Sequence, residues 1–315
     1  MFREVYGRTD AELGFPDDDA HGPGEELRAR LAAARTVDTA TVETFRAQIE
    51  HTRRLDRQFG ALTQLDQLRH NIDHVVDLLM YGPPAGHRTG LAAALTEAST
   101  LAGWQALDRE DTPQAWEHYE RAKHAAREAE SPLLLAHATA EQGFVLTALG
   151  KNTHAADHTT HARALADHRA PPLLRAWLAA AHGETLAAIG DRDGALRAFD
   201  TAGALLPTDP IDPALPFLFL GGGHLDRWRG NALAQLGEPD AIAQLTGALA
   251  RLPAAWVRSR CAVLVDLAFA YAAAGDRDAA QAHARAARQL ARQVRSDRHL
   301  RRLSGLVLPG GRATA

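Results

Sequence analysis

The chain of 315 residues is predicted to be all-α, an α-solenoid built of antiparallel helix pairs. Five turn positions are spaced at intervals of 40, 40, 47 and 38 residues: Glu110, Gly150, Gly190, Gly237 and Gly275. Polar turn residues and then a segment rich in small residues follow each of them. No stretch shows the alternation of apolar and polar residues that is typical of a β-strand. A period of this size, made of two helical segments and a turn, is typical of an α-solenoid.

The segments that flank the repeats are assigned from their turn residues and apolar spacing. Residues 1–37 are rich in turn residues and are expected to form an irregular N-terminal arm. From Asp38 onward, apolar residues recur at steps of three and four, as one face of a helix requires. Residues 38–84 are therefore expected to form an N-terminal helical pair that ends at Gly82-Pro83-Pro84. Residues 297–315 are expected to form a C-terminal tail.

The repeats themselves occupy residues 85–296. Five helix pairs are predicted, over the ranges 90–129, 131–168, 172–206, 214–252 and 256–295. Seven positions before each turn stands a small residue, which would let the two helices of a pair approach closely: Gly103, Gly143, Gly183, Gly230 and Ala268. The proline-rich stretch 207–213 is an insertion, and it explains the single interval of 47 residues.

Composition excludes several classes of function. The net charge of −4 argues against a simple polycationic nucleic-acid binder. No apolar run reaches the roughly 18 residues of a membrane span, so no membrane association is expected. Cys261, which lies in an apolar run, is the single cysteine of the chain. A single cysteine excludes an internal disulfide and fits a reducing compartment. We therefore expect a cytoplasmic protein.

The third repeat carries the residues of a known family. It resembles the tetratricopeptide (TPR) pattern at nearly every position: Gly183, Leu186, Gly190, Asp191, Ala195, Phe199, Ala202 and Pro207. The other four copies are degenerate. The resemblance covers about residues 90–295 and implies a binding module.

A narrower resemblance extends over nearly the whole chain. Four stretches are similar to the helical C-terminal region of actinobacterial regulators whose N-terminal domain is a Cro/repressor-type helix-turn-helix: 6–15, 101–106, 216–220 and 224–231. In that family the first of these stretches follows the DNA-binding domain, whereas here it stands at the start of the chain. The resemblance thus implies a regulatory role without the DNA-binding domain, and a separate DNA-binding protein as a possible partner.

The TPR frame also predicts a ligand groove. In that family the first helix of each pair lines the concave face, with its inward positions six, ten and thirteen residues before the turn glycine. Carried over to this chain, those positions give a candidate groove of aromatic, charged and polar side chains: Trp104, His137, Phe144, Trp177, Glu184, His224, Arg227, Asn231 and Phe269. Arg227 and Asn231 lie four residues apart on one helix face, where they could bind a peptide carboxylate or backbone.

Two alternatives remain open for these side chains. Trp104 and Trp177 could pack against the N-terminal helices instead of facing a ligand. Arg227 could pair with Asp226 or Glu184.

Catalytic and metal chemistry have little support in the sequence. There is no His-Glu-x-x-His, no glycine-rich phosphate loop and no Gly-x-Ser-x-Gly elbow. His154, Asp157, His158 and His161 share a helical spacing, but the repeat frame places them on the outward side of their helix, where a solvated face is the simpler interpretation. We expect no catalytic residue, no metal and no cofactor, and hence no enzyme.

The expected function is therefore binding. The chain is predicted to be a regulatory sensor module that holds a peptide, a protein segment or a small signal in its concave groove, without direct contact with nucleic acid. The alternative is a self-associating scaffold or adaptor, for example a homodimer, that has no small ligand.

Overall fold

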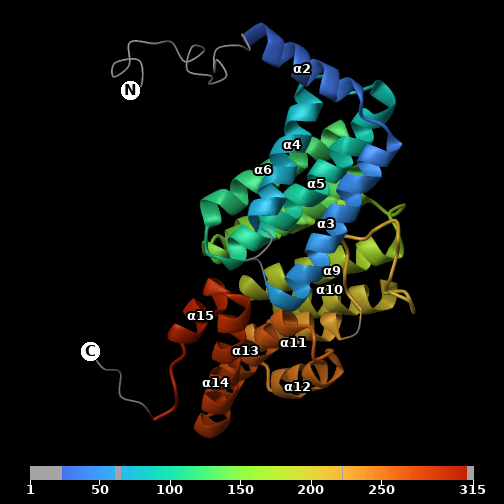
Figure 1. Cartoon of the computed structure of the whole chain (residues 1–315). Helices are drawn as coiled ribbons and strands as arrows, with labels where there is room; N and C mark the ends of the chain where they lie inside the picture. Colours follow the sequence, from blue (N-terminus) through green and yellow to red (C-terminus); the bar gives the residue numbers. More distant parts are fainter. Residues whose placement is uncertain (1–22, 61–64, 222, 311–315) are drawn as a thin grey trace, which may run out of the picture.

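All regular structure in the described part of the chain is α-helical (Figure 1). The computed structural model describes residues 23–60, 65–221 and 223–310. Within them the helices are α2 (Pro23–Arg35), α3 (Thr39–Phe59), α4 (Leu65–Met80), α5 (Ala85–Asp108), α6 (Thr112–Glu128), α7 (Pro132–Ala148), α8 (Asn152–Ala166), α9 (Pro172–Ala188), α10 (Arg192–Leu205), α11 (His224–Leu236), α12 (Ala241–Arg251), α13 (Val257–Ala273), α14 (Arg277–Val294) and α15 (Asp297–Ser304). None of these helices is long and apolar enough to cross a membrane.

Five antiparallel pairs, from α5/α6 to α13/α14, form the solenoid, and each is connected by the same turn. The turn residue takes a positive φ in every pair, between 62° at Glu110 and 84° at Gly275. The next N–H donates to the carbonyl five residues back, as Asp191 does to Leu186 at 3.0 Å. Glycine reaches this conformation without strain, which is why four of the five turns contain it.

The helices of a pair cross where the small residues were predicted. A Cβ built on Gly183 would stand 2.8 Å from the ring of Phe199, and one on Gly103 would stand 2.9 Å from the ring of Tyr119. At Gly230 the obstructing side chain is Leu245, at 2.7 Å. At these three crossings, glycine lets the facing side chain lie directly on the backbone of the first helix.

The two ends of the solenoid are brought together by helices outside the repeats. Helix α3 packs on α5 and also reaches α13, and α15 contacts both α13 and α5 (Figure 1). The first and last pairs are therefore joined across the inner side of the molecule. This closure shapes the site described below.

Two assignments at the chain ends are corrected by the structure. Residues 23–35, expected to belong to an irregular arm, form α2, whose first turn is acidic and whose last turn is basic, as the helix dipole favours. The rest of that arm, 1–22, lies outside the described residues. Residues 297–304, expected to belong to a tail, form α15, because Ser296 caps its N-terminus and Leu303 is buried.

Candidate functional site

A cavity of about 270 Å³ is lined by the first helices of all five pairs, together with α3, α15 and the loop 206–221. Eight of the nine residues predicted for the groove line it: Trp104, His137, Phe144, Trp177, Glu184, His224, Arg227 and Asn231. They come together because stacked pairs place equivalent positions toward a common axis. Phe269 is not in the lining, and Arg302 covers its ring at 5.8 Å.

Several further lining residues come from outside the repeat frame and were not predicted. Helix α3 provides Arg53, Asp56 and Arg57, while α15 provides Arg298, His299 and Arg302. The insertion provides Phe217 and Phe219, and α13 provides, among others, Trp256 at its N-cap. Two phenylalanines in a proline- and glycine-bounded loop were a usable signal, since an exposed loop seldom carries them.

Aromatic rings form two clusters in the cavity wall. The first cluster consists of His137, Phe144, Trp177, Phe217 and Trp228. Within it, His137 lies 4.7 Å from Trp177 and 4.8 Å from Phe217, and Trp177 meets Trp228 edge-on at 5.5 Å.

The second cluster consists of Phe219, His224 and Trp256. Phe219 is 4.5 Å from His224 and 4.6 Å from Trp256, with the Arg57 guanidinium over its ring at 5.0 Å. The insertion thus contributes one ring to each cluster and forms part of the cavity wall.

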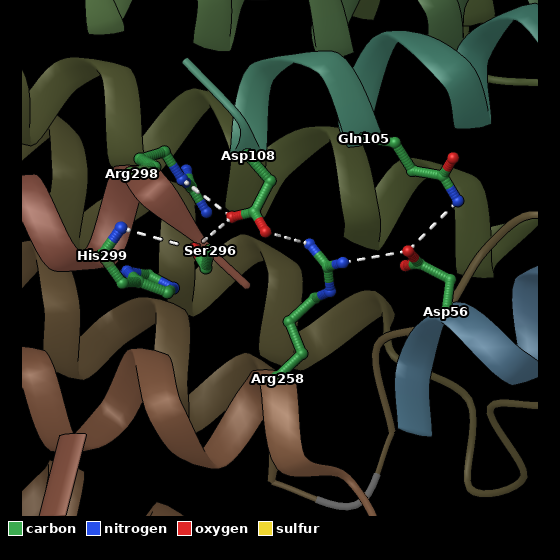
Figure 2. A network of polar contacts seen from close by, with 7 residues as sticks. All are labelled: Asp56, Gln105, Asp108, Arg258, Ser296, Arg298 and His299. Carbon is green, nitrogen blue, oxygen red and sulfur yellow. Dashed lines mark hydrogen bonds and ion pairs between the residues drawn. The ribbon is translucent and has the colours of Figure 1, made fainter. Parts of the chain in front are cut away.

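A buried polar network closes the solenoid beside the cavity (Figure 2). Arg258 of α13 donates to Asp108 of α5 at 2.6 Å and to Asp56 of α3 at 2.9 Å. Gln105 donates to the same oxygen of Asp56 at 3.1 Å, and Ser296 donates to Asp108 at 2.7 Å. We call Asp56, Asp108, Arg258 and Ser296 the clasp. Its members join α3, α5 and α13 to the N-cap of α15.

The two carboxyl groups of the clasp differ in pKa. Burial would raise both, but Arg258, Arg298 and the hydrogen bond from Ser296 outweigh it at Asp108, whose pKa is lowered. At Asp56 burial prevails over Arg258, and the pKa is raised. Asp108 is therefore the firmly ionised partner of Arg258 at neutral pH.

Arg227 and Glu184 stand in the cavity lining without a partner among the described residues. Arg227 makes no side-chain hydrogen bond or ion pair there, and its guanidinium lies over the ring of Trp228, 5.7 Å from the ring centre. The alternative pairing with Asp226 is not present, because Asp226 binds Arg251 at 2.7 Å and Gln244 at 2.9 Å. Pairing with Glu184 is not present either, although the two charges are close enough to influence each other's pKa.

Burial also sets the ionisation of the cavity side chains. It raises the pKa of Glu184 and of Glu141 to about 7. It lowers the pKa of His137 to about 3 and that of His224 to about 2, so both imidazoles are neutral at physiological pH. Arginine stays charged in proteins, so the arginine side chains of the cavity remain cationic at physiological pH.

The histidine-rich face of α8, considered above as a metal site, shows contacts within the protein. The ring of His158 contacts the carbonyl of His154 at 3.1 Å and lies 6.3 Å from Trp116. Within residues 23–60, 65–221 and 223–310, no group of three His, Cys, Asp or Glu side chains is placed to hold a metal ion.

Neither a protein-family model nor a curated protein matches the sequence. Among solved structures, the chain is similar to a Rap protein complexed with Competence and Sporulation Factor, with a TM-score of 0.57 and 15% identity over 85% of this chain and 72% of that one. It is also similar to BtubC (BKLC) from P. vanneervenii, with a TM-score of 0.48 and 16% identity over 80% of this chain and 95% of that one. The described residues have the fold of a TPR-like α-solenoid.

Proposed function

We propose that this protein is a TPR-type sensor module with a regulatory role, and that its ligand, a small signalling molecule or the end of a peptide, occupies the cavity. The observation that carries the proposal is the pair Arg227 and Glu184. These two half-buried side chains of opposite charge type line one cavity without a hydrogen bond or ion pair to each other or to any other described residue. Buried charges without partners are unfavourable, and a ligand that bonds to both would relieve that cost.

The solenoid offers a way to transmit binding. Each helix pair touches chiefly its neighbours, so a ligand that contacts α5, α9 and α11 together favours one curvature of the whole stack. The Rap protein of similar fold is complexed with Competence and Sporulation Factor, which supports a ligand-binding use here. The similarity to helix-turn-helix regulators supports a regulatory output through a separate DNA-binding protein.

A search for bound ligand tests the proposal. The purified protein is incubated with the small-molecule and peptide fraction of a cell extract, washed and unfolded, and the released compounds are identified by mass spectrometry. Arg227→Glu should release none of the compound that the wild type retains. Arg229→Glu is the matched control, because Arg229 pairs with the exposed Asp200 at 2.8 Å, and it should retain the compound.

Two results would contradict the proposal. One is a wild-type protein that retains no compound. The other is an Arg227→Glu variant that retains as much as the wild type. Light scattering on the same samples tests the alternative of a self-associating scaffold, which requires a stable dimer with the cavity residues in its interface.

A further inference from the structure

We infer that the ligand is a compact aromatic acid, whose anionic group lies against Arg227 and Arg298 and whose ring lies in the first aromatic cluster. This inference rests on the proposed function and adds the chemical class. Four features of the cavity support it: its charge balance, the position of Arg298, the aromatic wall beside Arg227, and the ionisation of Glu184.

The charge balance of the cavity favours an anion. Six arginines line it: Arg53, Arg57, Arg227, Arg258, Arg298 and Arg302. Three of them are neutralised by direct bonds, from Arg53 to Glu97 at 3.0 Å, from Arg302 to Asp266 at 2.8 Å, and from Arg258 within the clasp. Of the lining carboxyl groups, Glu141 and Glu184 are about half protonated near neutral pH, so they offset the remaining cations only in part.

Arg298 adds a second cation with donors to spare. Its Nε lies 3.5 Å from Asp108, beyond a strong hydrogen bond, and has no hydrogen-bond partner among the described residues. Its guanidinium lies over the ring of Trp104 at 4.8 Å. Arg227 of α11 and Arg298 of α15 both line the cavity, and the charge of each lowers the pKa of Glu184. Two guanidinium groups in the wall of one cavity suit a carboxylate.

The aromatic wall places a ring next to that anion. Trp228 is adjacent to Arg227 in sequence, and its ring is 5.7 Å from the Arg227 guanidinium. Phe144 and Trp177 both meet Trp228 edge-on, at 6.0 and 5.5 Å. All three rings line the cavity, and aromatic side chains bind a flat ring by offset or T-shaped contacts. The cavity of about 270 Å³ and the closing helices α3 and α15 favour a small molecule over a long peptide.

Binding should be linked to protonation of Glu184. The groups that face it are Arg227 from α11, Asp266 from α13, and Arg298 and Arg302 from α15. An anion bound between Arg227 and Arg298 adds negative charge beside Glu184 and favours its neutral form. Affinity should therefore increase as pH falls from 8 to 6. The increase should approach tenfold per pH unit above the pKa of Glu184, where binding takes up one full proton. Each tenfold step corresponds to about 1.4 kcal/mol of binding free energy.

Isothermal titration calorimetry with matched probes tests the inference. The probes are indole-3-acetate, phenylacetate and 1-naphthoate, each with its neutral amide, and tryptamine as the cationic member. At least one acid should bind, and bind at least tenfold more tightly than its amide and than tryptamine.

Arg227→Gln should weaken binding of the acid by about 10- to 100-fold, as expected for the loss of a charged hydrogen bond. Arg229→Gln should leave it unchanged, and Glu184→Gln should flatten its pH dependence.

The outcomes separate this inference from the proposed function. If an amide or tryptamine binds as well as the acids and Arg227→Gln weakens it, the cavity binds ligands but the assigned class is wrong. If no probe binds, the class is wrong as well, and the retained-compound experiment decides the function alone. Arg298→Gln is a second variant in case Arg227→Gln does not fold. Tighter binding of glycyl-tryptophan than of indole-3-acetate would assign the site to peptide ends and overturn the choice of a small acid.

Discussion

Glu184 and Glu141 are two residues whose ionisation the fold opposes. Burial raises the pKa of each to about 7 from an ordinary value of 4.5. Glu141 accepts a hydrogen bond from Tyr119 at 3.1 Å, whereas Glu184 has no hydrogen-bond or ion-pair partner among the described residues. Glu184 is therefore the carboxyl group of the cavity that a ligand would change most.

Replacing Glu184 with glutamine should stabilise the ligand-free protein above pH 7 and change it little at pH 5. Between pH 4.5 and 7 the native state binds more protons at this position than the unfolded state does, so the free energy of unfolding falls as pH rises. Glutamine removes that fall because it does not ionise. Thermal unfolding midpoints from pH 5 to 8 measure the effect, with the exposed Glu117→Gln as control. A difference from the wild type that does not vary with pH would contradict the raised pKa.

At the scale of the helix pair, the crossing of α9 and α10 depends on Gly183. Alanine there gains roughly 0.5–1 kcal/mol in helix propensity, but its Cβ would stand 2.8 Å from the Phe199 ring, and overpacking costs about 1–3 kcal/mol. Gly183→Ala should therefore destabilise the protein by about 1 kcal/mol. Gly143→Ala meets nothing nearer than 3.4 Å and should be neutral or slightly stabilising. Urea unfolding midpoints compare the two, and equal midpoints would argue against a steric role for Gly183.

Three of the second helices, α6, α10 and α14, begin at an aspartate whose side chain caps them. The Asp191 side chain accepts a hydrogen bond from the Gly194 N–H at 2.9 Å at the start of α10, whereas Asp240 at the start of α12 makes no such bond. Asp191→Ala should cost about 1 kcal/mol of unfolding free energy, and Asp240→Ala should stay within about 0.5 kcal/mol. Urea denaturation monitored by circular dichroism gives both values. A larger loss at Asp240 would show that capping does not explain the difference.

At the scale of the whole molecule, the sequence predicted what depends on local geometry. The turn glycines, the small residues at the crossings and the inward positions all follow from one repeated helix pair, so Trp104, Trp177 and Arg227 could be assigned to a common face. The contributions of α3 and α15 could not be predicted. They depend on the curvature that accumulates over five pairs, which brings Arg258 to Asp108 across 150 residues of sequence.

The clasp should hold the solenoid closed. Arg258→Leu leaves Asp56 and Asp108 buried without their shared cation, and breaking a buried ion pair in this way costs about 3–5 kcal/mol. We expect the variant to lose about 3 kcal/mol of stability at pH 7 and its radius of gyration in solution scattering to increase as α13 separates from α3 and α5. Without Arg258 the pKa of each carboxyl group should be higher than in the wild type, because the largest charge that opposes burial is gone. The loss should therefore be smaller at pH 5, where these groups take up protons in the native state.

Two further variants isolate closure from a general loss of stability. Arg260 lies on the same helix but donates only to the nearby carbonyls of Leu249 and Leu252, so Arg260→Leu should lower stability without changing the radius of gyration. Combining Arg258→Met with Asp56→Asn and Asp108→Asn removes the buried charges together and should recover much of the lost stability. If Arg258→Leu unfolds like the wild type and scatters with the same radius, the ends of the solenoid are held together by apolar packing of α3 and α15 instead.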